Sequence, residues 1–287
     1  MPTLYRSFAS PAEIDAQYNP ALGLADPAQP MAHYRAQAAL ARSRFKSILG
    51  IPYGPTKAET LDIFPADAPG APVFVFLHGG YWRAYTSHDF HGVALGLQPL
   101  GITTVVVNYA LCPWVSLDEI VRQARAAVAW VLRHVADYGG DPARVALGGH
   151  SAGAQLTAMG LLTDWAGDYG LSADPLRAAV LISGIYDIAP LRWSFLQPLI
   201  QLDDGLIRRN SPLNHLRPCA TPVLTTWGQA ETAEFSRQAH DFHAAWSAAG
   251  NASTLQALAQ ANHFEAVHPL ESPSGVLSQW LVRALAA

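Results

Sequence analysis

The sequence predicts an α/β protein with a doubly wound, mostly parallel central sheet and a small cap segment after the sixth strand. Short apolar runs such as Val73–Leu77 have the composition of strands that are buried on both faces, as in parallel sheets covered by helices. Stretches of helical length and composition separate these runs. Because strands and helices alternate along most of the chain, the connections favour parallel pairing with helices on both faces of the sheet.

The expected elements are separated by turn signals rich in glycine and proline. Strands are expected at Phe45–Ile51, Leu61–Phe64, Val73–Leu77, Thr103–Asn108, Val145–Leu147, Ala178–Ile182, Pro222–Trp227 and Ser253–Leu258. Helices are expected at Met31–Arg44, His88–Leu97, Ser116–Tyr138, Ala152–Leu162, Thr232–Ala249 and Pro273–Ala286. We interpret residues 1–287 as one domain with an N-terminal arm (residues 1–44). The segment 183–218 is too long and too aromatic for a plain loop, so we interpret it as the cap.

The composition argues against several classes of protein. The net charge is −4 at pH 7 and no run of Lys and Arg occurs, so we expect no nucleic-acid partner. No apolar run approaches the roughly 20 residues of a membrane span, and the N-terminus lacks a signal-peptide pattern, so we expect a cytoplasmic protein with no membrane partner. Cys112 and Cys219 lie far apart without the spacing of metal ligands, and we expect neither a metal nor a cofactor. The sequence leaves open whether the protein forms a homodimer.

The segment Gly149–Gly153 is the strongest functional signal. Its sequence, Gly-His-Ser-Ala-Gly, lies between a predicted strand and a predicted helix. A serine on such a turn has a strained backbone, and glycines two residues before and after it let the strand and the helix pass close together. The helix that begins at Ala152 directs its free amides toward the group that the serine attacks. Ser151 is therefore the expected nucleophile.

A serine nucleophile needs a histidine base, and on a turn of this type the histidine follows the serine in the chain. His263 comes directly after the last predicted strand, in a loop at its carboxyl end, where open α/β sheets place their chemistry. It is the expected base. His268 is the alternative base. The alternative for His263 itself is an ordinary histidine in a surface loop, without a catalytic role.

The acid that orients the histidine should leave the sheet one strand earlier. Glu231 follows the strand Pro222–Trp227 after the turn glycine Gly228, and we assign it as the acid. Two other carboxylates compete with it. Glu234 lies one turn further on, where it also suits a helix start, and Asp187 follows the preceding strand.

The segment His78–Trp82 comes directly off the buried strand Val73–Leu77 and contains two glycines. They let the backbone of Gly79, Gly80 and Tyr81 fold close to the serine, so that its amides and the amide of Ala152 form an oxyanion hole. An ordinary Gly-Gly turn is the alternative. His78 is expected to brace the loop.

These motifs resemble those of the kynurenine formamidase (arylformamidase) type of α/β-hydrolase, within the hormone-sensitive-lipase-like esterases. The resemblance rests on His78–Trp82, Gly149–Gly153, Tyr138–Pro142, Asn262–Phe264, Leu61–Phe64, and Glu234-Phe235 with Gln238. It implies the α/β-hydrolase fold, with Ser151, His263 and Glu231 as nucleophile, base and acid. The glutamate at 231 is a departure, because an aspartate is expected there in the family. A formamidase substrate would also favour a cation for its carboxylate; the candidates that the sequence leaves open are Arg83, Arg192 and Arg208.

We therefore expect a serine hydrolase that acts through an acyl-enzyme on a small aromatic amide or ester. The amide could be a formyl- or acyl-anilide, such as an N-acylanthranilate. Tyr81, Trp82 and Trp193 are the residues expected to contact a flat substrate. The alternatives are a general short-chain carboxylesterase and, outside the enzymes, a small-ligand-binding protein on the same fold.

Overall fold

The computed structural model describes residues 3–286 and builds them around one eight-stranded sheet. The strands are β1 (Ile48–Pro52), β2 (Thr60–Phe64), β3 (Ala71–Leu77), β4 (Thr103–Val107), β5 (Gly140–His150), β6 (Ala178–Ile182), β7 (Val223–Gly228) and β8 (Ser253–Leu258). Their order across the sheet is β1-β2-β4-β3-β5-β6-β7-β8. The pairs β1–β2 and β2–β4 are antiparallel and the others are parallel. The expected α/β fold with a mostly parallel sheet is thus confirmed.

The central strands are buried on both faces, as their unbroken apolar sequences predict. In β3, Val73, Val75 and Leu77 pack into the core on one face of the sheet, whereas Phe74 and Phe76 pack into the core on the other. This division follows from the alternation of side chains along a strand. Because β3 to β8 run parallel, their carboxyl ends meet at one edge of the sheet.

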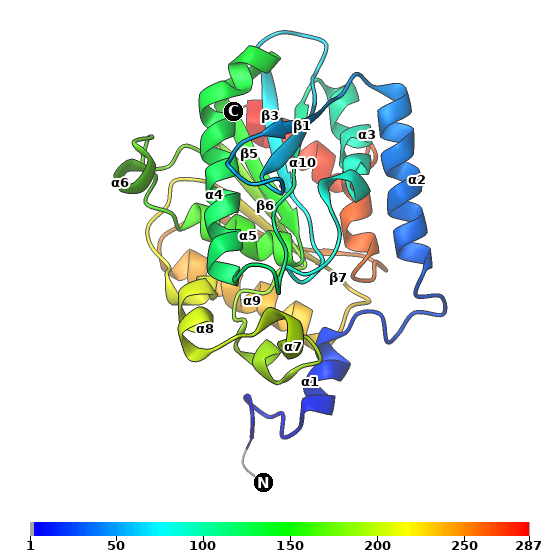
Figure 1. Cartoon of the computed structure of the whole chain (residues 1–287), viewed down its shortest axis with the longest axis vertical. Helices are drawn as coiled ribbons and strands as arrows, with labels where there is room; N and C mark the ends of the chain where they lie inside the picture. Colours follow the sequence, from blue (N-terminus) through cyan, green and yellow to red (C-terminus); the bar gives the residue numbers. More distant parts are fainter. Residues whose placement is uncertain (1–2, 287) are drawn as a thin grey trace.

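Helices cover both faces of the sheet (Figure 1). They are α1 (Pro11–Tyr18), α2 (Gln29–Arg44), α3 (Ala94–Leu97), α4 (Leu117–His134), α5 (Ala152–Leu161), α6 (Trp165–Tyr169), α7 (Gln197–Ile200), α8 (Asp204–Asn210), α9 (Ala233–Ala248) and α10 (Val276–Ala286). The 3₁₀ helices are η1 (Ser87–Asp89), η2 (His91–Val93), η3 (Gln98–Leu100), η4 (Val135–Tyr138), η5 (Ala189–Trp193), η6 (Pro212–Asn214) and η7 (Glu265–Leu270). Buried side chains of α4, α5 and α9 join the core on one face, and those of α2 and α10 join the core on the other. Among residues 3–286, no helix combines the length and the hydropathy that crossing a membrane requires.

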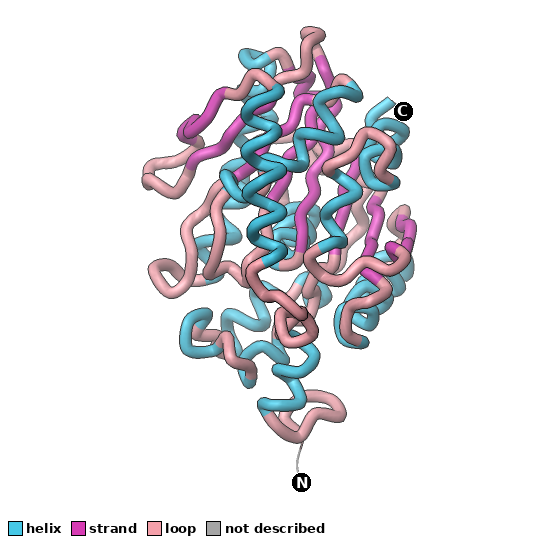
Figure 2. Tube along the Cα trace, turned by 90° about the vertical axis from the view of Figure 1, so that its right-hand side faces the viewer, coloured by secondary structure: helices cyan, strands magenta, loops and turns pink. Residues whose placement is uncertain are grey.

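The cap predicted after β6 is a chain of short helices, η5, α7, α8 and η6. Figure 1 shows α7 and α8 beside α1 at the end of the molecule where the N-terminus lies, and Figure 2 shows the same end from the side, beyond the strands. The N-terminal arm is fixed to the cap, because the backbone N–H of Phe195 donates to Asp15 (2.8 Å). Arm and cap therefore lie together over the carboxyl edge of the sheet.

Several elements differ from the sequence expectations, the stretch 88–97 and the N-terminal arm most clearly. The helix expected at His88–Leu97 is wrong, because this stretch is divided among η1, η2 and α3. The backbone at Phe90 leaves the helical region between η1 and η2, and a side chain at Gly96 would lie 2.3 Å from the carbonyl oxygen of Leu270. This packing holds the stretch directly against η7. Helix α1 was not expected, although Ser10 caps it through the backbone N–H of Glu13.

Candidate active site

The structure brings together the three side chains that the sequence assigns to a catalytic triad. Ser151 follows β5, Glu231 follows β7 and His263 follows β8, so all three lie at the carboxyl edge of the sheet. The hydroxyl Oγ of Ser151 lies 3.0 Å from Nε2 of His263, and Nδ1 of His263 lies 2.7 Å from Oε2 of Glu231. With Nδ1–H donating to the carboxylate, Nε2 is free to accept the serine proton.

Ser151 has the strained backbone that the Gly-His-Ser-Ala-Gly sequence predicts. Its φ and ψ are 58° and −118°, outside the regions that side chains ordinarily allow. A side chain at Gly149 would lie 2.2 Å from the carbonyl oxygen of Gly153, and one at Gly153 would lie 1.9 Å from that of Leu77. Gly149 therefore lets β5 pass close to α5, and Gly153 lets α5 pass close to the end of β3.

Glu231 is held by two donors besides His263. Its Oε1 accepts the backbone N–H of Gly228 (2.7 Å) and the hydroxyl of Ser183. Ser183 follows β6 directly and has a positive φ of 50°, which directs its hydroxyl to the neighbouring strand end. The longer glutamate side chain thus reaches His263 with both carboxylate oxygens satisfied.

The competing carboxylates have other partners. Glu234 is buried and binds Arg237 (2.7 Å) and the hydroxyl of Tyr18 (2.7 Å). Asp187 accepts the hydroxyl of Tyr5 (2.7 Å) and also caps a backbone N–H two residues later. Neither carboxylate is hydrogen-bonded to His263.

His150, beside the nucleophile, also contacts the base loop. Its Nε2–H donates to the carbonyl oxygen of His263 (2.8 Å), which fixes the backbone of that residue. Burial and the nearby His263 ring lower the pKa of His150 well below its usual range, so it stays neutral. The turn that carries Ser151 therefore also positions the loop that carries His263.

The loop after β3 runs directly against the nucleophile. A side chain at Gly79 would lie 3.2 Å from Cβ of Ser151, and Gly80 has a positive φ of 111° in the turn that follows. Within residues 3–286, the backbone amides of Gly80, Tyr81 and Ala152 donate to no other group. They are therefore available to a substrate oxygen, as the oxyanion-hole prediction requires.

His78 braces this loop from below. Its ring stacks on Tyr109 (4.2 Å between centroids) and on Phe90 (5.7 Å), and its Nδ1–H donates to the carbonyl oxygen of Gly79 (2.7 Å). Burial lowers the pKa of His78 to about 4. A neutral, stacked imidazole suits a structural role and not that of a base.

A cavity of about 130 Å³ opens in front of Ser151 and His263. Six of its sixteen lining residues are Phe or Tyr, and the wall also includes Arg83 and a short piece of the N-terminal arm. The residues that line it are Asn19, Pro20, Ala21, Tyr34, Gly79, Gly80, Tyr81, Arg83, Ala84, Tyr85, Phe90, His150, Ser151, Phe195, His263 and Phe264. A small planar group suits a space of this size and lining.

Of the aromatic residues expected to contact substrate, Tyr81 lines the cavity and the two tryptophans do not. Trp82 is completely buried, and its Nε1–H donates to Gln155 on α5 (3.0 Å). Trp193 is 40% exposed and lies outside the cavity with the guanidinium of Arg192 over its ring. Their positions do not fit substrate contact; Trp82 instead connects the oxyanion loop to the helix behind the nucleophile.

The sequence reasoning missed the part of the wall that the arm supplies. Residues 19–21 cover the cavity, and Tyr34 donates its hydroxyl to the carbonyl oxygen of Phe264, the residue after the base (2.6 Å). The hydroxyl of Tyr81 donates to the carbonyl oxygen of Tyr18 at the end of α1. The cap signal at Ser10 could have revealed α1, but no local pattern indicates which surface it covers.

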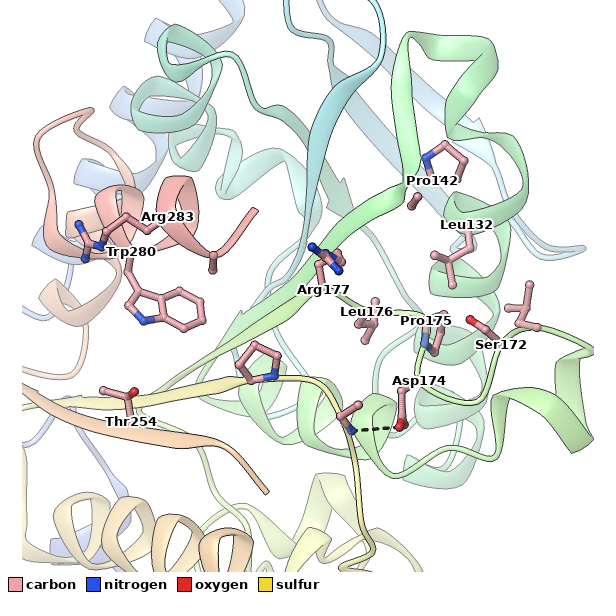
Figure 3. A pocket seen from close by; sticks show the side chains of 15 residues that line it. Leu132, Pro142, Ser172, Asp174, Pro175, Leu176, Arg177, Thr254, Trp280 and Arg283 are labelled. Carbon is pink, nitrogen blue, oxygen red and sulfur yellow. Dashed lines mark hydrogen bonds between the residues drawn. The ribbon is translucent and has the colours of Figure 1, made fainter. Parts of the chain in front are cut away.

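A larger groove, of about 870 Å³, lies at the opposite edge of the sheet (Figure 3). Pro142, Arg177 and Thr254 lie at the amino ends of β5, β6 and β8, far from the strand ends that carry Ser151 and His263. Open α/β sheets bind their ligands at the carboxyl ends of the strands. The smaller cavity is therefore the candidate active site.

In the part of the chain that the structure describes, two groups of side chains have the composition of metal ligands. In the group His33, His268 and Glu271, the His33 ring is hydrogen-bonded to Glu271 (2.7 Å), and its centroid lies 4.0 Å from that of the His268 ring, with 31° between the ring planes. The hydrogen bond between His33 and Glu271 already uses one ligand atom of each. In the group Asp62, His88 and His91, His91 already uses both ring nitrogens, one with Asp62 and one with an arginine.

Several known proteins are similar to this chain. A family model described as the alpha/beta hydrolase fold matches residues 74–266, more than half of the chain. Kynurenine formamidase of Danio rerio is 28% identical over 252 residues, which are 85% of this chain and 84% of that protein. Esterase LipQ of Mycobacterium tuberculosis is 32% identical over 237 residues, 74% of this chain and 56% of that protein.

Solved structures give the same fold. The crystal structure of a putative thioesterase from Silicibacter sp. has a TM-score of 0.82 and 25% sequence identity, covering 96% of this chain and 99% of that one. An esterase from Pyrobaculum calidifontis has a TM-score of 0.71 at 18% identity, covering 96% and 98%. The resemblance to kynurenine formamidases and related esterases is thus confirmed. The chain belongs to the α/β hydrolase fold family and is a hydrolase of the esterase and formamidase type.

Proposed function

We propose that this protein is a serine hydrolase that cleaves a small aryl amide or ester through an acyl-enzyme. The observation that carries the proposal is the continuous hydrogen-bonded path from Glu231 through His263 to Ser151, with contacts of 2.7 and 3.0 Å. A serine becomes a competent nucleophile only beside such an oriented base.

In the proposed reaction, Oγ of Ser151 attacks the substrate carbonyl carbon while Nε2 of His263 takes the hydroxyl proton. The negative charge on the carbonyl oxygen is stabilised by the amides of Gly80, Tyr81 and Ala152. His263 then gives its proton to the leaving aniline nitrogen or alcohol oxygen as the bond to the carbonyl carbon breaks, which leaves the acyl group on Ser151. Water then gives a proton to the same imidazole and attacks the acyl carbon. The bond from that carbon to Oγ of Ser151 breaks, His263 returns the proton to Oγ, and the acid is released.

The substrate class follows from the cavity and the relatives. The aromatic wall suits an aryl group, and the small volume in front of Ser151 suits a formyl or short acyl group. A formyl- or acyl-anilide agrees with the name of the Danio rerio relative, a kynurenine formamidase. A short-chain carboxylester is the second candidate, because LipQ and the Pyrobaculum calidifontis structure are esterases.

The test uses Ser151→Ala with phenyl acetate, and it labels the wild-type protein with an organophosphate. We expect no turnover by the variant, an unchanged unfolding midpoint, and one phosphoryl group on Ser151 of the wild type. Comparing kcat/KM on formylkynurenine, longer N-acylanthranilates and short aryl esters then ranks the substrates. Turnover by the variant, or labelling at another residue, would contradict the proposal.

A further inference from the structure

Arg83 is the residue on the cavity wall that carries a permanent charge. Among residues 3–286, no aspartate or glutamate lines this cavity, and its other ionisable side chains are histidine and tyrosine. Arg83 follows the oxyanion loop directly, and its backbone N–H donates to the carbonyl oxygen of Gly80 (3.1 Å). The turn that shapes the oxyanion loop therefore also places a guanidinium at the same cavity as Ser151.

Arg83 lacks the counter-charge that several other arginines of the chain have. Arg122 binds Glu59 at 2.6 Å, and Arg237 binds Glu234 at 2.7 Å. In the described part of the chain, Arg83 forms no ion pair and no side-chain hydrogen bond, and its Nε is buried without a partner. Withdrawing a charged group from water without a partner is unfavourable, and an anion bound there would offset that penalty.

The surroundings of Arg83 indicate which anion fits. The guanidinium carbon lies 6.0 Å from the centre of the Phe195 ring, with which it forms a cation–π contact, and Tyr34 and Tyr85 complete the aromatic wall. A single planar guanidinium offers two parallel N–H donors, which match a carboxylate. A phosphate or sulfate ester exposes three oxygens and is typically bound by more than one cation, whereas Arg83 is the one permanent cation among the described residues that line this cavity.

We propose that Arg83 is the specificity-determining residue of this site and binds a carboxylate carried by the aryl portion of the substrate. The preferred substrates are then anionic aryl amides and esters, and neutral ones of the same shape are poorer. This inference rests on the proposed hydrolase function. A purely structural role, in which Arg83 only packs the oxyanion loop against the cap through Phe195, is the competing explanation.

The kinetic test compares phenyl acetate with 2-, 3- and 4-acetoxybenzoate, which add only a carboxylate to the aryl ring. We expect the wild type to have a higher kcat/KM for at least one of the three isomers than for phenyl acetate. Arg83→Gln should lower the ratio of kcat/KM for the preferred acetoxybenzoate to kcat/KM for phenyl acetate by about 10- to 100-fold. This is the effect expected for loss of a hydrogen bond to a charged group. Arg83→Glu should reverse the charge preference, so that kcat/KM becomes higher for the cationic 3-(trimethylammonio)phenyl acetate than for the acetoxybenzoates. Replacing a merely structural residue would not give this gain.

Arg192→Gln and Arg208→Gln are matched controls. Both arginines lie outside the cavity, so the ratio should stay at its wild-type value in these variants. The ratio in the wild type should also fall with rising ionic strength. The inference is overturned if the wild type prefers phenyl acetate to all three isomers, or if Arg83→Gln leaves the ratio unchanged.

A binding experiment separates this inference from the proposed function. Titration calorimetry would measure benzoate, and benzamide as the neutral analogue, on the Ser151→Ala protein with and without Arg83→Gln. If benzoate binding depends on Arg83 while the wild type hydrolyses no ester, the anion subsite stands and the hydrolase proposal fails. If the esters are hydrolysed and benzoate binding does not depend on Arg83, the hydrolase proposal stands and the subsite fails.

Discussion

Replacing Glu231 with glutamine tests the least conventional member of the triad. In the wild type, Oε2 accepts from Nδ1 of His263, and Oε1 accepts from Gly228 and Ser183. Glutamine has the same shape but only one acceptor oxygen. If its NH₂ faces His263, the imidazole must turn its lone pair to Nδ1 and its proton to Nε2, and it is no longer a base for Ser151. If the NH₂ faces Gly228, two donors oppose each other.

The first arrangement removes the hydrogen bond that orients His263, and the second strains the loop that carries residue 231. The wrong histidine tautomer lowers the turnover of serine hydrolases by about 10⁴-fold, equivalent to roughly 5 kcal/mol of barrier. We therefore expect kcat of Glu231→Gln on phenyl acetate to fall by about 10³- to 10⁴-fold. Glu231→Asp should retain more activity, because it keeps the charge although it shortens the reach to His263.

The assay is steady-state hydrolysis of phenyl acetate, with urea unfolding measured on the same preparations. Glu234→Gln is the matched control: it removes a buried carboxylate three residues away that binds Arg237 and Tyr18. We expect this control to lower the free energy of unfolding while kcat of the folded protein stays close to wild type. A Glu231→Gln variant that keeps kcat within about tenfold of wild type would refute the assignment of the acid.

Two further predictions concern residues around the oxyanion loop. Trp82→Phe leaves the amide oxygen of buried Gln155 without its donor, so the free energy of unfolding should fall by about 1–3 kcal/mol. KM for phenyl acetate should stay the same. A higher KM with unchanged stability would place Trp82 at the substrate. Burial lowers the pKa of His78 from 6.5 to about 4. Between pH 6.5 and 4, the imidazole is therefore protonated in the unfolded chain and neutral in the folded protein. The free energy of unfolding should fall as the pH drops through this window, by at most about 3 kcal/mol. His78→Asn should flatten the pH dependence of urea unfolding between pH 7 and 4.5, and an unchanged slope would contradict the neutral assignment.

The parts of the fold and site that could be predicted are those that depend on local sequence alone. The apolar runs of β3 to β8 and the glycines around Ser151 have local physical requirements, so the strands and the turn could be placed before the structure was known. The order of the triad then followed from the position of each candidate after a strand. The break in the helix at His88–Leu97 could not be predicted in this way, since it depends on packing of Gly96 against η7.

The substrate side was harder to predict for the same reason. An aromatic residue beside the oxyanion glycines suggests substrate contact, but the positive φ of Trp82 (57°) turns its side chain into the core against α5. The cavity wall comes instead from distant segments, such as Tyr34 in the arm and Phe195 in the cap. Sequence alone also left three arginines as candidates for binding a carboxylate, and only the cavity distinguishes Arg83 from the other two.

The hydrogen bond from His150 to the carbonyl oxygen of His263 couples the nucleophile turn to the base loop. The base loop is held on its other side by Tyr34, which donates to the carbonyl oxygen of Phe264. Two consecutive carbonyl groups of this loop are thus fixed by β5 and by the arm, while Glu231 fixes the imidazole itself. Because catalysis depends on sub-ångström placement of the base, the arm that covers the cavity also contributes to the geometry of the triad. Substitutions in the arm should therefore change kcat as well as substrate affinity.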